Sequence, residues 1–394
     1  MVIFVAIFFA QPIKSGAVFL ESTKFANCKD VKFDKTKLDA GEVCPKFTDY
    51  ESYKLEKLQP RKLSANIVKE YENWDDEEFQ SHKQKIYDEA REAGVDRFVA
   101  REFLKRAKFI PAVKARDNNQ PEKISTLSDY IKRRISKDFY DLLVKKSSEK
   151  NQKLDEVFKS IESDFGVERS ILMSLWMSET NFSSFIGSSD PFSALATLSF
   201  KDRRAKFFRK NLIDLMKLMS MGHIPVEAKS SADGGIGGVQ FMPQTFFTYG
   251  IDWDLDGKID LFNSEPDMIA SAANYLHNAG WRKNEPILTV VELPDNFDYC
   301  NIGYIKSKGR TVQEWRSLGV KIPQNDKFER VGFSNEDRIA WLVMTDKVSQ
   351  FENGCKPIAM LAYENFGVLL DWNRSTANVA ILAIYNKVIQ DLQQ

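Results

Sequence analysis

The sequence predicts a mainly α-helical protein of the α+β class, with an α-helical lobe and a small β-containing lobe. Apolar residues recur at helical spacing through most of residues 63–286. The pattern then changes, because residues 288–293 are strand-like and short β-compatible runs recur between Gly and Pro up to about residue 333. With 394 residues, 43% of them hydrophobic and 28% charged, the chain is long enough for one large soluble domain with sub-lobes.

The remaining elements follow from periodicity and helix breakers, in chain order. Gly94 separates two helices within residues 63–107, and a loop is expected over 109–122. Further helices are expected over residues 127–164 (interrupted around 147–152), 167–180, 203–221, 266–280 and 377–392. These elements divide the chain into an α-helical lobe (61–170), a core (171–286), a small β-containing lobe (287–350) and a C-terminal segment with a closing helix (351–394).

The charge balance argues against a nucleic-acid-binding protein. Lys and Arg number 56, as do Asp and Glu, so the formal net charge is zero, whereas binding to phosphate groups requires a basic surplus. Three histidines and the lack of a C-x-x-C motif argue against a structural zinc site. We therefore expect no nucleic-acid partner and no catalytic cofactor.

The N-terminus indicates export. Residues 2–10 are nine apolar residues, too few to cross a bilayer but suited to a signal peptide, although no Lys or Arg precedes them. We expect a signal peptide over residues 1–20 and an extended polar leader over 21–60. Residues 25–28 resemble a lipoprotein acylation site, but Asn27 is a poor residue before the cysteine, so membrane association has only weak support.

Four cysteines fit an exported protein. Chain order suggests one bridge between Cys28 and Cys44 and another between Cys300 and Cys355. Sequence alone leaves the other two pairings open.

Glu179 is the candidate general acid. Leu172, Leu175 and Trp176 precede it by seven, four and three positions, so a helix places them beside the carboxylate on one face. Such surroundings disfavour the charged carboxylate, so we expect its pKa to rise toward the range of a general acid at neutral pH. The alternative is a partly exposed glutamate at the end of a helix.

An acidic loop predicts a cation site. Asp252, Asp254 and Asp256 alternate before Gly257, as in loops whose carboxylates converge on Ca²⁺, and Lys258 would add its backbone carbonyl. The twelfth position holds Asn in place of the usual Glu, so Asp267 at the start of the next helix is the candidate for the last ligand. We expect a structural Ca²⁺ that braces the loop; an acidic turn without metal is the alternative.

A glycine-rich loop over residues 231–243 leads into a helix. It lacks the G-K-[ST] and G-x-G-x-x-G patterns of phosphate-binding loops. Its glycines instead favour close approach of the backbone to a polymeric ligand, and Gln240 could bind substrate amides through hydrogen bonds.

A series of motifs in order resembles the lytic murein transglycosylases of the B type. The motifs are WMSET (176–180), ALATLSF (194–200), GGVQFMPQTF (237–246), the acidic loop, AANYLHNAGW (272–281), TVQEW (311–315) and ENFGVLLDWNRS (364–375). DNNQPE (117–122) and SDYIKRRIS (128–136) match upstream segments, so the resemblance covers roughly residues 61–392. It implies a lysozyme-like catalytic core, a periplasmic location and cleavage of the β-1,4 bond between N-acetylmuramic acid and N-acetylglucosamine in peptidoglycan.

The resemblance also assigns roles to individual residues. Glu179 matches the catalytic acid/base, Ser231 and Gln240 match residues that line the saccharide cleft, and Asn373 matches the Asn of the Y-N-x-S motif. The acidic loop matches the calcium loop of the family. Two tryptophans beside these motifs, Trp176 and Trp372, are further candidates for substrate binding.

Two departures from the family pattern affect the shape of the cleft. Residues 176–180, WMSET, stand where the family has W-G-x-E-[ST], so Met177 replaces the glycine, and Trp372 stands where the family has Tyr. Glu179 itself is retained.

A single carboxylate is sufficient if the sugar supplies the nucleophile. Most glycosidases use two carboxylates, and the only candidate partner, Asp190, lies in a Ser/Pro-containing loop. Glu179 would protonate the glycosidic oxygen and then deprotonate the muramic C6 hydroxyl, which attacks C1 and gives a 1,6-anhydro product. The alternatives are a muramidase that uses water and a non-catalytic peptidoglycan-binding scaffold. In each case the partner is a glycan strand, and we expect a monomer.

Overall fold

The computed structural model describes residues 77–118, 136–201, 203–294, 297, 302–322, 336–344 and 358–393. The expected signal peptide (1–20), the leader (21–60) and all four cysteines lie outside the described residues. The residues that are described form a mostly helical body and one small antiparallel sheet, which confirms the predicted α+β class.

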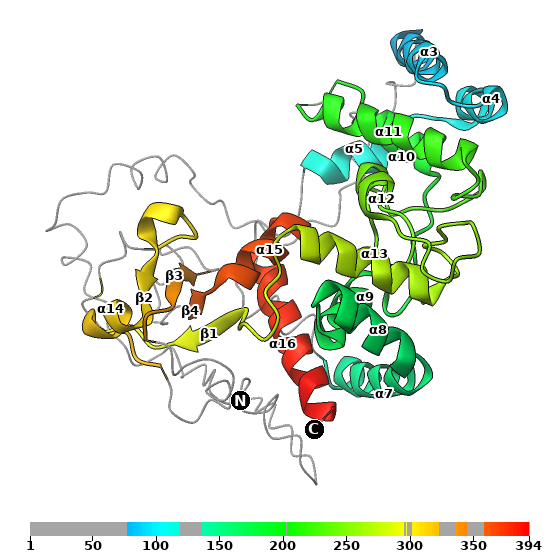
Figure 1. The fold of residues 1–394 in the computed structure, drawn as a ribbon. Helices are drawn as coiled ribbons and strands as arrows, with labels where there is room; N and C mark the ends of the chain where they lie inside the picture. Colours follow the sequence, from blue (N-terminus) through cyan, green and yellow to red (C-terminus); the bar gives the residue numbers. More distant parts are fainter. Residues whose placement is uncertain are drawn as a thin grey trace, which may run out of the picture.

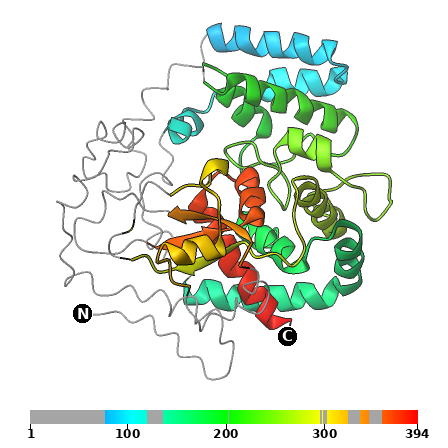
Figure 2. The same cartoon turned by 60° about the vertical axis from the view of Figure 1, so that its left-hand side comes forward.

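Three helices begin the described chain. They are α3 (Glu77–Glu92), α4 (Arg97–Arg106) and α5 (Pro111–Asn118). Gly94 has a φ of 84° in the turn between α3 and α4, a conformation that glycine adopts without strain. Asp96 caps α4 by accepting hydrogen bonds from the backbone N–H groups of Phe98 and Val99. In Figure 2 these helices lie at the end of the molecule opposite α7 and α8.

The central part of the chain forms seven further helices. They are α7 (Lys137–Lys153), α8 (Asp155–Phe165), α9 (Arg169–Thr180), α10 (Pro191–Leu198), α11 (Ala205–Ser220), α12 (Pro243–Tyr249) and α13 (Glu265–Asn278). The break between α7 and α8 falls at Leu154, slightly after the expected interruption at 147–152. Apolar side chains from all seven helices pack into one core, and the fully buried Phe158, Trp176, Phe192 and Phe246 are among its largest members.

The sheet lies on the opposite side of the molecule in Figure 1. Its strands are β1 (Leu288–Val291), β2 (Arg310–Thr311), β3 (Ile339–Met344) and β4 (Ala359–Ala362), in the antiparallel order β1-β4-β3-β2. A short 3-10 turn, η5 (Lys306–Lys308), precedes β2, and α14 (Val312–Ser317) follows it. The expected boundary at residue 350 divides this sheet, because β4 pairs with both β1 and β3 from beyond it.

A second, smaller core stabilises the sheet. Trp315 on α14 is fully buried, and its indole N–H donates a hydrogen bond to the carbonyl of Ala340, at 2.9 Å. Leu342, Leu361 and Tyr363 belong to the same apolar cluster. The β-containing lobe therefore has packing of its own besides its contacts with the helical body.

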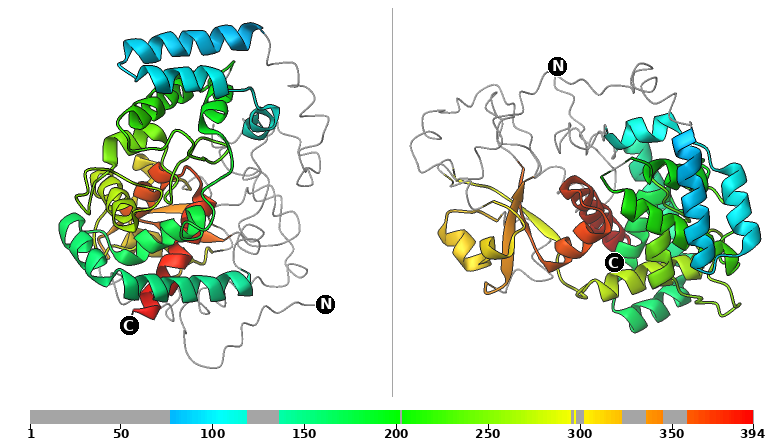
Figure 3. Two further views of the ribbon diagram at one scale, coloured as in Figure 1. Left: turned by 90° about the vertical axis from the view of Figure 1, so that its right-hand side faces the viewer. Right: turned by 90° about the horizontal axis from the view of Figure 1, so that it is seen from above.

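The last two helices lie between the sheet and the helical body. They are α15 (Glu364–Trp372) and α16 (Thr376–Leu392), drawn in red in Figures 1 and 3. The expected closing helix is present as α16, which is buried on most of its circumference, including every residue from Asn378 to Tyr385. A helix that is apolar on all sides is usually central to its fold, and α16 packs extensively against α9. None of the described helices has both the length and the apolar character needed to cross a bilayer.

Candidate active site

The site is built around the last turn of α9. Leu172, Leu175, Trp176 and Met177 are at most 2% exposed, whereas Glu179 is partly exposed. The Glu179 carboxylate therefore lies at the partly exposed end of a helix whose preceding turns are buried. Asn181 ends the helix with a left-handed backbone conformation (φ 52°).

Trp372 holds the carboxylate of Glu179. Its indole Nε1 donates a hydrogen bond to Oε1 of Glu179 at 3.1 Å. The Trp372 ring packs against the rings of Phe241 and Tyr275, with centroids 5.3 and 5.1 Å away. Burial raises the pKa of Tyr275 to about 12, so its phenol stays neutral at physiological pH. Trp372 therefore links the Glu179 carboxyl group to side chains from two further segments of the chain.

The glycine-rich loop is tied to the residue after Glu179. The hydroxyl of Thr180 donates a hydrogen bond to the carbonyl of Gly238 at 2.5 Å. A Cβ atom at Gly238 would lie 2.1 Å from the sulfur of Met268 and 2.4 Å from Oγ of Ser183. Only glycine allows this close packing of the loop against α9 and α13.

The structure brings Ser231 and Gln240 together at opposite ends of this loop. Oγ of Ser231 accepts a hydrogen bond from the backbone N–H of Gly235, and a Cβ atom at Gly235 would lie 3.1 Å from both that Oγ and Oε1 of Gln240. The amide nitrogen of Gln240 donates to the carbonyls of Ile186 and Gly237, at 3.0 and 2.9 Å. Because the nitrogen is used within the protein, a ligand would meet the oxygen of this side chain.

Asn373 directly follows Trp372 and caps α15. Its backbone N–H donates to the carbonyl of Leu369 at 3.0 Å, and the residue is partly exposed. The structure therefore places it beside the residue that contacts Glu179. Its expected role in substrate binding stays a prediction.

Trp176 does not fit the expected role in substrate binding. It is 1% exposed, its Nε1 donates to Oγ of Ser183 at 2.8 Å, and its ring meets Phe182 edge-on at 5.1 Å. The ammonium of Lys150 lies 4.9 Å from the centre of the ring. Trp176 lies in the core, where its contact with Ser183 supports the segment after α9.

Asp190 is occupied by structural contacts. It caps α10 by accepting from the backbone N–H and the hydroxyl of Ser193, at 3.0 and 2.7 Å, and it forms an ion pair with Arg106. Because both oxygens are engaged, Asp190 is not available as a second catalytic carboxylate.

The acidic loop brings three carboxylates together. Oxygen atoms of Asp252, Asp254 and Asp256 all lie within 4.8 Å of one another. The loop turns at Gly257, with a φ of 89°, and the backbone N–H of Gly257 donates to Asp252 at 2.9 Å. Three converging carboxylate oxygens suit a hard cation such as Ca²⁺, so the side chains of this loop fit the expected ion.

Asp267 lies in the first turn of α13, as expected, but outside the three-aspartate cluster. It is fully buried, and its two carboxylate oxygens accept from the backbone N–H groups of Trp253 and Asp260, both at 2.8 Å. Burial raises its pKa, and the nearby charge of Asp254 raises it further. The Lys258 ammonium pairs with Asp260 at 2.8 Å, away from the three-aspartate cluster. Asp267 thus supports the loop from inside and is not part of that cluster.

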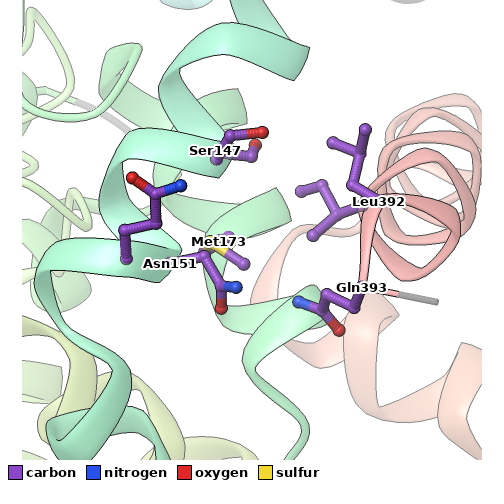
Figure 4. Close-up of a pocket in the computed structure, with 8 residues that line it drawn as sticks. Ser147, Asn151, Met173, Leu392 and Gln393 are labelled. Carbon is purple, nitrogen blue, oxygen red and sulfur yellow. The ribbon is translucent and has the colours of Figure 1, made fainter.

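A cavity of about 120 Å³ lies elsewhere, between α7, α9 and α16 (Figure 4). Its lining residues include Ser147, Asn151, Met173, Leu392 and Gln393. None of the candidate site residues lines it, and Met173 lies nearly two helical turns before Glu179. The cavity is therefore separate from the candidate active site.

Comparison with known proteins decides the family. The family described as Transglycosylase SLT domain matches residues 78–384. The chain belongs to this transglycosylase SLT family. Membrane-bound lytic murein transglycosylase B of Escherichia coli (strain K12) is 32% identical over 159 residues. That match covers 38% of this chain and 44% of the E. coli protein, so the chain matches less than half of that relative.

Solved structures share the fold of this SLT-family chain. SltB3 from Pseudomonas aeruginosa, in complex with NAG-anhNAM-pentapeptide, has a TM-score of 0.66 at 25% identity, with 78% of each chain covered. The E. coli lytic transglycosylase Slt35, in complex with calcium, has a TM-score of 0.64 at 22% identity, covering 78% of this chain and 92% of that one. Structure and family thus agree with the resemblance seen in the motifs.

Sequence reasoning missed several residues that assemble the SLT-family site. Thr180, Phe241 and Tyr275 all lie within motifs that were recognised, but their contacts to Gly238 and Trp372 depend on the tertiary fold. Helical spacing could have shown that Tyr275 lies two turns after Asp267 on one helix, but not which ring it meets.

Proposed function

We propose that the chain is a lytic transglycosylase that cleaves the β-1,4 bond between N-acetylmuramic acid and N-acetylglucosamine in peptidoglycan and releases a 1,6-anhydromuramic product. The observation that carries this proposal is the Glu179 carboxyl group at the end of the buried helix α9, bound by Trp372, within a matched SLT domain. The related SltB3 structures are described as complexes with muropeptide fragments. We also propose that the chain acts in the periplasm, on glycan strands and as a monomer.

The proposed mechanism uses one carboxyl group twice. The protonated Glu179 gives its proton to the glycosidic oxygen as the bond from that oxygen to C1 of the muramic residue breaks. The resulting carboxylate takes the proton of the C6 hydroxyl, whose oxygen attacks C1 and closes the anhydro ring. This step restores the protonated acid, and the substrate's own acetamido group helps to stabilise the developing positive charge.

One feature of the structure and one of the substrate support a mechanism with a single carboxylate. Asp190, the alternative partner, is held by Arg106 and Ser193. An internal hydroxyl has a high effective concentration, so no second carboxylate is needed to activate water.

Replacement of the acid tests the proposal directly. Glu179→Gln keeps the hydrogen-bonding shape but cannot donate the proton, so we expect release of soluble fragments from purified sacculi to fall at least about 1000-fold. Wild-type products should be one water lighter by mass spectrometry than those of a muramidase. Products with reducing ends would favour the muramidase, and sacculus binding without release would favour the binding scaffold.

We also propose a structural Ca²⁺ on the acidic loop. Asp252, Asp254 and Asp256 would supply carboxylate oxygens, and Lys258 its backbone carbonyl. Asp267 braces the loop through its backbone contacts. The ion stabilises the entry into α13 and takes no part in the chemistry.

A further inference from the structure

Three successive residues directly after Glu179 and Thr180 have a left-handed backbone. Asn181, Phe182 and Ser183 have φ values of 52°, 55° and 62°. Such a run without glycine is rare, because each L side chain is strained there. Strain of this kind persists only where surrounding contacts enforce it, and it concentrates at functional sites. We call residues 181–187 the post-catalytic loop.

Contacts at the beginning of the post-catalytic loop enforce its conformation. The ammonium of Lys146 donates to the carbonyl of Asn181 at 3.1 Å and also bonds the hydroxyl of Ser184. Oγ of Ser183 accepts from the indole of Trp176, and the backbone N–H of Ser183 donates to Oγ1 of Thr180 at 3.0 Å. The loop is therefore rigid where it leaves α9.

The other end of the loop is fixed to the glycine-rich loop. Gln240 donates to the carbonyl of Ile186, at 3.0 Å. Gly187 lies so close to Ser230 that a Cβ atom there would be 2.1 Å from the Ser230 carbonyl oxygen. Ser189 and Ser230 then exchange two backbone hydrogen bonds of 3.0 Å. The post-catalytic loop thus spans from the end of the Glu179 helix to the loop that carries Ser231 and Gln240.

Phe185 lies in the post-catalytic loop, and its side chain is exposed to solvent. It is 68% exposed, whereas its neighbour Phe182 is 5% exposed, and its backbone N–H donates to the carbonyl of Thr180 at 3.2 Å. A rigid loop that presents a large apolar ring between two groups of site residues is suited to contact a ligand. The C–H face of a pyranose ring is apolar and flat, and it packs well on an aromatic ring.

We propose that Phe185 is a substrate-binding residue that packs against the apolar face of a sugar of the glycan strand, next to the bond that Glu179 cleaves. This inference rests on the proposed function for the identity of the ligand. It assigns the strained run to a purpose: the run turns the chain back to the end of α9, where the backbone N–H of Phe185 bonds the carbonyl of Thr180, the residue after Glu179.

The test compares two exposed phenylalanines. Phe98 on α4 is 62% exposed but belongs to the N-terminal helices, far from α9 in Figure 1. With soluble uncross-linked glycan strands as substrate, we expect Phe185→Ala to raise KM about three- to tenfold while kcat changes less than twofold. Phe98→Ala should leave both values unchanged. Phe185→Trp should restore the wild-type KM.

Binding is measured separately, in the Glu179→Gln background. We expect pull-down of glycan strands to weaken with Phe185→Ala and not with Phe98→Ala, even if the wild-type chain released no anhydro product. An unchanged KM and unchanged pull-down in Phe185→Ala would overturn the proposal, and so would equal effects from Phe98→Ala. Loss of binding to lipid vesicles with an unchanged KM would also overturn it, since the ring would then contact a membrane.

Discussion

The indole nitrogen of Trp372 lies 3.1 Å from a carboxylate oxygen of Glu179, although the two residues are 193 positions apart in the chain. The indole N–H can only donate, so it fixes the carboxyl group in one orientation and favours an acceptor at that oxygen. A tyrosine, which the related motif has at this position, can both donate and accept. The departure in sequence therefore preserves a donor and removes an acceptor.

Loss of this donor should reduce turnover. In Trp372→Phe the ring is kept but the hydrogen bond is removed, and a bond to a charged group contributes roughly 1.5–3 kcal/mol. We expect kcat on soluble glycan strands to fall about 10- to 100-fold, with a smaller change in KM. Trp372→Tyr should keep most of the activity. Equal activity of Trp372→Phe and the wild type would show that the hydrogen bond has no catalytic effect.

Removal of calcium should lower thermal stability. Asp252, Asp254 and Asp256 repel one another without a cation, and the loop leads directly into α13. We expect EDTA to lower Tm by several degrees and added Ca²⁺ to restore it, as expected for a ligand that binds the folded state. Asp254→Asn should weaken this response, whereas Asp164→Asn, on α8 and outside the cluster, is a matched control. An identical Tm with EDTA and Ca²⁺ would count against the metal site.

Enlargement of Gly238 should uncouple the glycine-rich loop from α9. An added methyl group overlaps Met268 and Ser183, so Gly238→Ala should destabilise the fold by about 1–3 kcal/mol and also lower activity on sacculi. Gly94→Ala is the comparison, since Gly94 has a φ of 84° but open space around it. That variant should lose roughly 1 kcal/mol of stability and retain full activity. If the two variants behave alike in the activity assay, the contact at Gly238 is not specific to the site.

His82 should make the fold less stable in acid. Burial, together with the positive charges of Arg209 and Lys85, lowers its pKa from 6.5 to about 4; the ring also bonds the hydroxyl of Ser199 at 2.9 Å. Between pH 6.5 and 4, His82 therefore binds a proton more readily in the unfolded chain than in the folded one. Stability from this group is complete above pH 6.5 and is lost as the pH falls toward 4.

Urea unfolding measures the His82 effect. The shift corresponds to at most about 3 kcal/mol, which the partial exposure of the ring reduces to about 1–2 kcal/mol. We expect the difference in unfolding free energy between pH 7.5 and 4.5 to be smaller by that amount in His82→Gln, whose amide can still bond Ser199. The same pH dependence in both proteins would assign the acid sensitivity to other groups.

The sequence predicted the parts of this molecule that depend on local pattern. The helix around Glu179, the break at Gly94 and the turn at Gly257 follow from spacing and backbone preference, and each is present. It failed where the answer depends on contacts between distant segments. Trp176 was expected to bind substrate, but the direction of one side chain on an apolar helix is decided by what packs against it, and Trp176 is 1% exposed.

The boundary at residue 350 was misplaced for a similar reason. Periodicity shows where a strand begins and ends, but not which strand it pairs with, and β4 joins its neighbours across a long stretch of chain. Asp267 was expected to bind metal because of its spacing from the acidic loop. Its carboxylate accepts hydrogen bonds from the backbone N–H groups of Trp253 and Asp260. These N–H groups need an acceptor because the folded loop gives them no backbone carbonyl, which the sequence does not show.

The packing of α16 against α9 also has a consequence for when the protein can act. Glu179 is synthesised about 190 residues before its hydrogen-bond donor and before the helix that supports α9. A nascent chain therefore cannot assemble its acid until Trp372 and α16 have emerged from the ribosome. The candidate acid is therefore assembled only by a chain that is almost complete, and truncation before Trp372 would leave Glu179 without this donor.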